Sequence, residues 1–301
     1  MANLPETNLT AHWDASVSTG NIYAGPLASW PPTGAVAHNE QAAIWKSSVG
    51  AYILRQSEAA ARAVPADMKW KNDTTMYLPS IQIIKGTYEG RRASNSEDLK
   101  GDDLINAGAK TVAISFLITG TSKLLNSGNS YGNTNLFGDP SGNYNGLFLR
   151  NNAGTLILYA YTWDGAEKQV NVSGLTTNTP YVAVYTHNGT NLILSVYDPN
   201  GQVSTTKTVA AGNTSDVLIA QALAASNAAF TEQAEIRVGE IVTYDAALSG
   251  GTLTQLTTYM RDRWTAVSSS GGHGKGQGGN HGGGKSIVVI SRHRRTERRR
   301  K

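Results

Sequence analysis

The chain has 301 residues, of which 40% are hydrophobic and 16% are charged, and it contains no cysteine. This composition is typical of a globular protein, and it excludes disulfides and thiolate metal sites. No apolar run reaches the ~18 residues of a membrane span, and the N-terminus lacks the basic and apolar regions of a signal peptide. We therefore expect neither membrane insertion nor secretion.

The net charge of +4 conceals an uneven distribution. Residues 271–301 hold nine Lys or Arg residues and one acid, a net charge of +8. The rest of the chain has 17 basic and 21 acidic residues, a net charge of −4. An acidic body with a basic tail favours an arm that binds an acidic surface of another molecule.

The first 110 residues give few structural signals. Residues 81–84 are apolar enough to predict a strand, the Ala-rich segment 58–64 favours a helix, and the stretch around Trp30-Pro31-Pro32 is irregular. From Lys110 onward the pattern changes, since strands follow one another in series. The first of them is predicted over residues 111–118.

Two hairpins are predicted next. Residues 146–161 form two apolar runs around the polar loop 151–154. Residues 181–197 form a second pair around Asn188-Gly189, a dipeptide that favours a type I′ turn because both residues tolerate a positive φ. These are the clearest local predictions in the chain.

The last strands precede a single helix. Residues 203–209 and 215–220 are short Thr/Val-rich candidates, and residues 234–244 alternate apolar with polar side chains as a half-buried strand does. Strands recur about every ten residues without crossover helices, a pattern that favours a sandwich. Residues 252–264 carry an apolar stripe at helical spacing, which predicts a helix that packs on the sandwich.

The composition changes abruptly after Val267. Three serines are followed by nine glycines among residues 271–284, and then by an apolar pentapeptide and a basic end. We therefore predict a β-sandwich over residues 1–267, a flexible linker over residues 268–285 and a basic anchoring arm over residues 286–301.

The predicted arm combines a short strand with a charge cluster. We expect the strand to add to the sheet edge of a neighbour and the arginines to meet an acidic protein surface. The basic segment has no interleaved aromatics and no reader fold, so nucleic acid is not the expected partner. The anchoring residues are Ile287, Val288, Val289, Ile290, Arg292, Arg294, Arg295, Arg298, Arg299 and Arg300.

Two segments resemble a known family. Residues 234–249 and the helix that ends in Tyr259-Met-Arg-Asp-Arg-Trp264 resemble the closing strand and helix of laminin-G-like, concanavalin A-like jelly rolls. Residues 9–16, Leu-Thr-Ala-His-Trp-Asp-Ala-Ser, are similar to the first strand of such domains. The resemblance implies an all-β jelly-roll sandwich over about residues 7–266, with one C-terminal amphipathic helix and an extended arm.

Domains of this appearance occur in minor tail and capsid-decoration proteins of tailed bacteriophages, in carbohydrate-binding modules and in some glycosidases. The resemblance thus implies a virion structural protein, made in the host cytoplasm, present in many copies or as a homo-oligomer and bound to other virion proteins through its arm. A free carbohydrate-binding module is the alternative.

A host surface polysaccharide is a further expected partner. Sugars bind to exposed aromatic rings, with amide or carboxylate groups that fix the hydroxyls. Four residues in or next to predicted loops fit this pattern and are our glycan-binding candidates: Tyr131, Tyr144, Trp163 and Asp164.

One loop has the oxygen spacing of a calcium site. Asp139, Ser141, Asn143 and Asn145 offer side-chain oxygens at alternate positions, as calcium loops do. The loop has only one charge, however, and a plain hairpin loop is the default interpretation. No other cofactor is expected.

The motifs of catalysis are incomplete. Gly128-Asn-Ser130-Tyr-Gly132 matches a nucleophile elbow, but a polar loop follows it instead of the helix that such an elbow requires. Glu235 and Glu240 are five residues apart, which predicts opposite faces of a strand rather than a glycosidase pair. His12, His38 and His187 show no metal-ligand spacing. We therefore expect the chain not to be an enzyme.

Overall fold

The computed structural model describes residues 2–24, 34–56, 67–85, 88–92, 109–121, 134–139, 145–163, 165–211 and 234–265. The predicted linker and anchoring arm lie outside these residues, as do the predicted helix over residues 58–64 and the predicted strand over residues 215–220. Their structure therefore stays a prediction.

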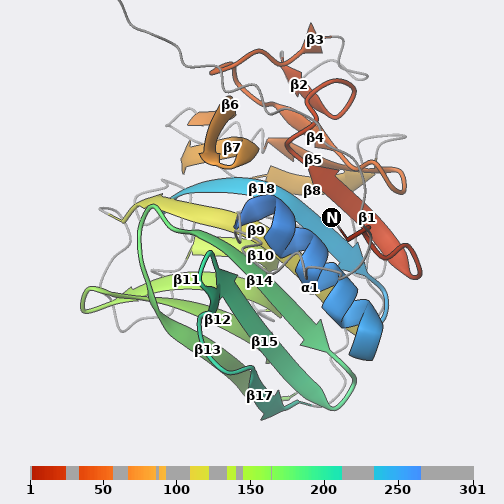
Figure 1. Cartoon of the computed structure of the whole chain (residues 1–301), viewed down its shortest axis with the longest axis vertical. Helices are drawn as coiled ribbons and strands as arrows, with labels where there is room; N and C mark the ends of the chain where they lie inside the picture. The colour runs from red at the N-terminus through yellow and green to blue at the C-terminus, as the bar shows by residue number, and fades with distance from the viewer. Residues whose placement is uncertain are drawn as a thin grey trace, which may run out of the picture. The chain divides into compact units, whose positions relative to one another are not determined.

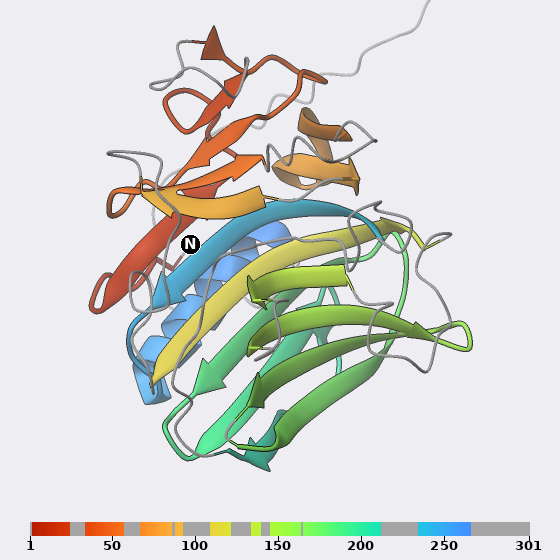
Figure 2. The ribbon, with the colours of Figure 1, turned by 180° about the vertical axis from the view of Figure 1, so that it is seen from behind.

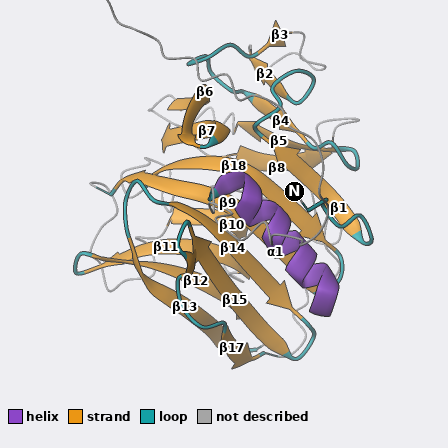
Figure 3. Ribbon diagram, viewed as in Figure 1, coloured by secondary structure: helices purple, strands orange, loops and turns teal. Residues whose placement is uncertain are grey.

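The described residues form antiparallel β-sheets and one helix (Figure 3), so the all-β expectation is confirmed. The elements in chain order are β1 (Leu9–Asp14), β2 (Ile22–Ala24), β3 (Gly34–Ala35), β4 (Ile44–Lys46), β5 (Tyr52–Gln56), β6 (Asp67–Met76), β7 (Leu78–Lys85), β8 (Tyr88–Arg92), β9 (Lys110–Gly120), β10 (Thr134–Asp139), β11 (Asn145–Asn152), β12 (Thr155–Trp163), β13 (Glu167–Leu175), β14 (Pro180–His187), β15 (Asn191–Asp198), β16 (Gly201–Gln202), β17 (Lys207–Ala210), β18 (Glu235–Tyr244) and α1 (Gly250–Trp264).

The largest sheet has nine strands, with β16-β15-β14-β9-β18-β7-β6 as its main order. Strand β17 pairs with β15, and β1 pairs with β18. One edge of β18 lies along β9, whereas the other is shared, since residues 236–238 pair with β7 and residues 240–244 with β1. The first and last strands of the domain are therefore neighbours (Figure 1).

A four-stranded sheet, β10-β11-β12-β13, lies across one face of the large sheet, and α1 covers the other face (Figure 2). The side chains of β9 show this division. Ile114 and Phe116 belong to the core between the two sheets, whereas Ala113 and Leu117 belong to the cluster beneath α1. Strand β9 is therefore buried on both faces, as a central strand of a covered sandwich must be.

Helix α1 closes the domain as predicted. Leu256, Met260 and Trp264 are fully buried, and Leu253 and Tyr259 pack partly buried beside them. The same helix explains why the half-buried interpretation of residues 234–244 is wrong. Strand β18 is buried on both faces, because α1 covers the side that the alternation assigns to solvent.

A third sheet is formed by the N-terminal part of the chain, in the order β3-β2-β4-β5-β8. Its strands have only two to five residues, which is too short for a clear periodic signal. Ile22, Trp45 and Leu54 nevertheless belong to the same buried cluster as Trp13 of β1. The sequence prediction of one simple sandwich therefore missed this layer.

The two predicted hairpins both form, but one turn differs from the prediction. Between β11 and β12, Ala153 and Gly154 have φ values of 50° and 89°, as a two-residue type I′ turn requires. In the turn after β14, only Gly189 has a positive φ, of 84°. Asn188 instead accepts hydrogen bonds at Oδ1 from the backbone N–H groups of Thr190 and Asn191, so the type I′ prediction is wrong there.

Within the described segments, a helix that could span a lipid bilayer is not found.

Candidate functional site

The main polar site of the described chain centres on Glu240, in the middle of β18. The pairing of β18 with β9 shifts register between Val238 and Glu240, which marks a β-bulge at Gly239. As a result, Val238 and Ile241 both point into the core between the sheets although they are three residues apart. Glu240 therefore faces α1, and its side chain is completely buried.

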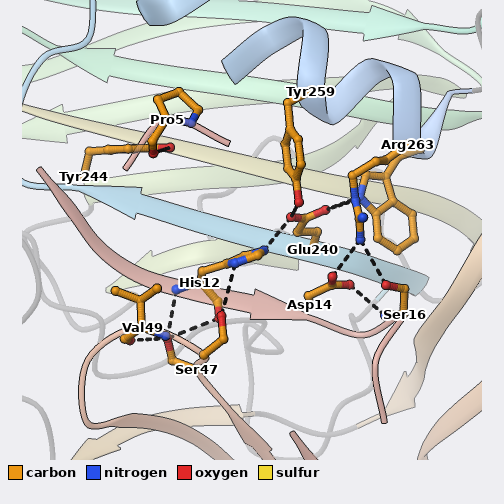
Figure 4. A network of polar contacts seen from close by, with 12 residues as sticks. Pro5, His12, Asp14, Ser16, Ser47, Val49, Glu240, Tyr244, Tyr259 and Arg263 are labelled. Atoms are coloured by element: carbon orange, nitrogen blue, oxygen red, sulfur yellow. Dashed lines mark hydrogen bonds and ion pairs between the residues drawn. The ribbon is translucent and has the colours of Figure 1, made fainter. Parts of the chain in front are cut away.

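Four side chains donate hydrogen bonds to the Glu240 carboxylate (Figure 4). Oε1 lies 2.6 Å from His12 Nε2 and 2.9 Å from the hydroxyl of Tyr259. Oε2 lies 3.0 Å from Arg263 Nε and 2.5 Å from Trp264 Nε1. A carboxylate can accept about four hydrogen bonds, so this one is fully satisfied.

Arg263 also connects Glu240 to the first strand. Its Nη2 donates to Asp14 Oδ2 at 2.6 Å and to Ser16 Oγ at 3.0 Å. Asp14 Oδ1 in turn accepts the backbone N–H of Ser16 at 2.8 Å. We call His12, Asp14, Glu240, Tyr259, Arg263 and Trp264 the Glu240 cluster; it joins β1, β18 and α1.

The electrostatics of the cluster favour an ionised carboxylate. Burial alone would raise the pKa of Glu240, but the hydrogen bond from His12 and the charge of Arg263 outweigh it, so the net pKa is lowered. Burial and the nearby Glu240 carboxylate raise the pKa of Tyr259, so its hydroxyl remains protonated and donates. The charged groups therefore compensate one another inside the protein, as buried ions must.

The cluster contains the side-chain types of a metal site. The ligand atoms of His12, Asp14 and Glu240 all lie within 4.8 Å of one another. However, Arg263 bonds to both carboxylates, so a cation would have to displace a guanidinium that already neutralises them. The arrangement is therefore an internal ion-pair network, in which the fold brings His12 next to a carboxylate that is distant in sequence.

An acid–base relay is the other chemistry that the geometry suggests. The exposed Ser48 has its Oγ 3.2 Å from His12 Nδ1, and His12 Nε2 contacts Glu240. A relay acid must direct its charge toward the histidine. The Glu240 charge is instead shared with Arg263 and two further donors, so the contacts favour a structural role.

The predicted glycan-binding residues fall mostly outside the described chain. Tyr131, Tyr144 and Asp164 are not among the described residues, and Trp163 is placed only as the last residue of β12. Glycan binding by this set therefore stays a prediction.

The predicted calcium loop is described only at its two ends. The backbone pairs Asp139 with Asn145 across β10 and β11, which is hairpin pairing, while Ser141 and Asn143 lie outside the described residues. Calcium binding stays a prediction. So does the role of the anchoring residues from Ile287 to Arg300, none of which is described.

Sequence reasoning missed the Glu240 cluster, although parts of it could have been found. His12 and Asp14 are two residues apart on a strand and hence share a face, and Tyr259 and Arg263 are four apart on a helix. Glu240 was assigned to the face opposite Glu235 by simple alternation. The bulge at Gly239 breaks that alternation, so spacing could not assign its face.

No protein-family model matches the sequence, and no curated protein matches it. Among solved structures, the binding domain of botulinum neurotoxin serotype D is 10% identical, with a TM-score of 0.44, and the match covers 82% of this chain and 52% of that structure. The receptor binding domain of the botulinum neurotoxin C/D mosaic serotype is 11% identical, with a TM-score of 0.45, and the match covers 84% of this chain and 51% of that structure. The sialidase of Trypanosoma rangeli is 12% identical, with a TM-score of 0.46, and the match covers 86% of this chain and 33% of that structure.

The chain thus matches about half of each neurotoxin domain and a third of the sialidase. At this level of likeness a shared function does not follow.

Proposed function

We propose that the chain is a non-enzymatic structural protein of a tailed-bacteriophage particle, either a minor tail or a capsid-decoration protein. The β-sandwich is displayed outward, and residues 286–301 hold it in the assembly. The domain is present in many copies and contacts other virion proteins through the arm. The displayed domain also contacts glycans on the host surface.

The observation that carries the proposal is the closure of the domain at its last helix. Trp264 ends α1, is fully buried and donates to Glu240, and Arg263 beside it bonds to Asp14 in the first strand. The glycine-rich sequence begins only a few residues later. A pulling force on the arm would act on the C-terminal end of α1. Buried contacts fix this end to the rest of the domain, as is needed in a domain that is tethered to a particle.

The non-enzymatic part of the proposal rests on the same cluster. Its carboxylates, guanidinium and imidazole bond to one another. They stabilise the packing of three elements, and this use leaves the Glu240 carboxylate without a free lone pair for a substrate.

Deletion of residues 271–301 tests the anchoring role. The shortened chain is expected to fold with an unchanged thermal midpoint but to be absent from particles purified on a density gradient and probed with an antibody. Two full-length variants separate the parts of the arm. One replaces Arg292, Arg294, Arg295, Arg298, Arg299 and Arg300 with Ser, and the other replaces Val288 and Val289 with Asp.

Either full-length variant should reduce incorporation, by removing charge attraction or strand addition respectively. Incorporation of the shortened chain at the wild-type level would refute the anchoring role. Polysaccharide binding by the shortened chain, with no particle association of the wild type, would instead identify a free carbohydrate-binding module.

A further inference from the structure

Tyr77 forms the reversal between β6 and β7 in an unusual backbone conformation. Its φ is +64°, in the left-handed region, and the residue is 44% exposed. This region is unfavourable for a bulky side chain, and turns that need it ordinarily use Gly or Asn. An aromatic ring at this position is therefore costly for the fold.

The flanking residues explain the reversal but not the ring. Met76 is fully buried, Leu78 is partly buried, and both belong to the hydrophobic cluster beneath α1. They are paired with each other across the turn. The turn is thus held on a rigid part of the domain, and only the residue between them is directed outward. A strained residue that packing does not require is a marker of function.

Polar groups precede the ring in the chain. The pairing of β6 with β7 shifts register between Lys71 and Met76, so the intervening residues bulge from the sheet. Asp73 Oδ1 fixes this bulge, because it accepts from Arg237 Nη1 at 2.5 Å and from the backbone N–H of Thr75 at 3.0 Å. Asn72 and Thr75 are exposed.

We propose that Tyr77 and the exposed polar groups of Asn72 and Thr75 form a carbohydrate-binding site. The phenol ring packs against the face of a sugar ring, and the amide and hydroxyl groups bind sugar hydroxyls, the combination that such sites use. The site rests on the proposed function, since it names a place where the displayed domain contacts glycans. It is separate in sequence from the candidates at Tyr131, Tyr144, Trp163 and Asp164.

A sugar suits this surface better than a protein partner does. A stable protein interface buries roughly 800 Å² on each partner around an apolar centre. Among the residues whose side chains the structure describes, only Val17 and Tyr77 are exposed large hydrophobic residues. A lone ring with polar neighbours in sequence offers one stacking platform, which matches the size of a single sugar unit.

The experiment uses the full-length chain on a printed array of bacterial capsular polysaccharides and O-antigens, followed by calorimetric titration of the strongest glycan. Tyr77→Ala and Tyr77→Gly are expected to weaken binding about tenfold or more, and Tyr77→Phe to stay within about threefold. Val17→Ala, the matched change at the other exposed apolar residue, should leave the affinity unchanged.

Stability separates binding from folding in this series. Ala and Gly both remove the ring, but only Gly relieves the positive φ, so Tyr77→Gly should unfold at a higher temperature than Tyr77→Ala. An equal loss of binding at unequal stability then assigns the loss to the ring.

Each other outcome overturns the proposal in a distinct way. Wild-type affinity in Tyr77→Ala would place the glycan elsewhere and leave glycan binding itself intact. If the wild type bound no glycan on the array, both this site and the proposed glycan contact would be refuted, whereas the proposed anchoring in a particle would stand. Loss of particle incorporation in Tyr77→Ala, with glycan binding kept, would make the ring a protein contact.

Discussion

A side chain at position 239 would overlap the indole of Trp264, since a Cβ built on Gly239 would fall onto Cζ3, Cε3 and Cη2 of its six-membered ring. The indole cannot move aside easily, because it is fully buried and its Nε1 donates to Glu240. Gly239→Ala is therefore expected to lower the free energy of unfolding by about 3 kcal/mol, as overpacking of a rigid core does. Urea denaturation measures this change.

Gly251→Ala is the matched control. Gly251 lies in the first turn of α1, and a Cβ there would meet nothing within 4 Å. The same substitution should raise the free energy of unfolding by about 0.5–1 kcal/mol there, because Ala favours the helix. If Gly239→Ala stayed within about 0.5 kcal/mol of the wild type, the indole would have to be free to shift.

Glu240→Gln tests whether the charge of Glu240 stabilises the domain. Gln keeps the shape of Glu but removes the charge that faces Arg263, and its amide nitrogen would face donors instead of accepting from them. We expect a loss of about 3 kcal/mol, the order found when one partner of a buried ion pair is removed. Chemical denaturation at pH 7 provides the measurement.

The pH dependence of stability follows from the same group. The pKa of Glu240 is lower in the folded protein than its ordinary value of 4.5 in the unfolded chain. The unfolded chain therefore binds more protons at acidic pH, so the stabilisation is present above that value and is lost as the pH falls through the folded pKa. The wild type should lose stability on acidification more steeply than Glu240→Gln.

Asp73 provides a comparison in the same titration. Partial burial raises its pKa, but hydrogen bonds from Arg237 and Thr75 outweigh this and bring it to about 2. Its side chain is 34% exposed, so solvent screens the interaction. Asp73→Asn should therefore reduce the loss of stability at acidic pH less than Glu240→Gln does. If the wild type and Glu240→Gln lost stability equally steeply on acidification, the role given to Glu240 would be contradicted.

Local patterns predicted much of the fold. The hairpin at residues 146–161 was visible because apolar runs flank a turn whose Ala153 and Gly154 adopt positive φ. Helix α1 could be predicted because its apolar residues recur at helical spacing and pack on the sheet. In both cases the information lies within about fifteen neighbouring residues.

The Glu240 cluster could not be predicted in this way. It joins residues 12–14 to residues 240 and 259–264, which follow more than two hundred residues later in the chain. The bulge at Gly239 interrupts the alternation and lies against Trp264, a residue of another element, so the local pattern of β18 alone gives the wrong face for Glu240. Likewise, Tyr77 has no sequence neighbour that predicts a positive φ.

Tyr244 fixes the segment that precedes β1. Its buried hydroxyl donates to the carbonyl oxygen of Pro5 at 2.9 Å. Tyr244→Phe leaves that carbonyl without this donor, so we expect a loss of about 1 kcal/mol. Amide hydrogen exchange in residues 2–8 should become faster, as measured by mass spectrometry. Unchanged exchange would show that other contacts hold this segment.

Arg263→Lys tests whether the guanidinium shape, and not only the charge, connects β1 to α1. Arg263 reaches Glu240 through Nε and both Asp14 and Ser16 through Nη2. A lysine has a single ammonium group at the end of its chain and cannot span these acceptors in one plane. The substitution is therefore expected to lower the free energy of unfolding by about 2 kcal/mol although the charge is kept.

Asp262→Asn is the control on the exposed side of α1 and should change stability by less than about 0.5 kcal/mol. If Arg263→Lys were as stable as the wild type, charge alone would hold the two elements together, and the forked geometry would contribute nothing to the closure of the domain.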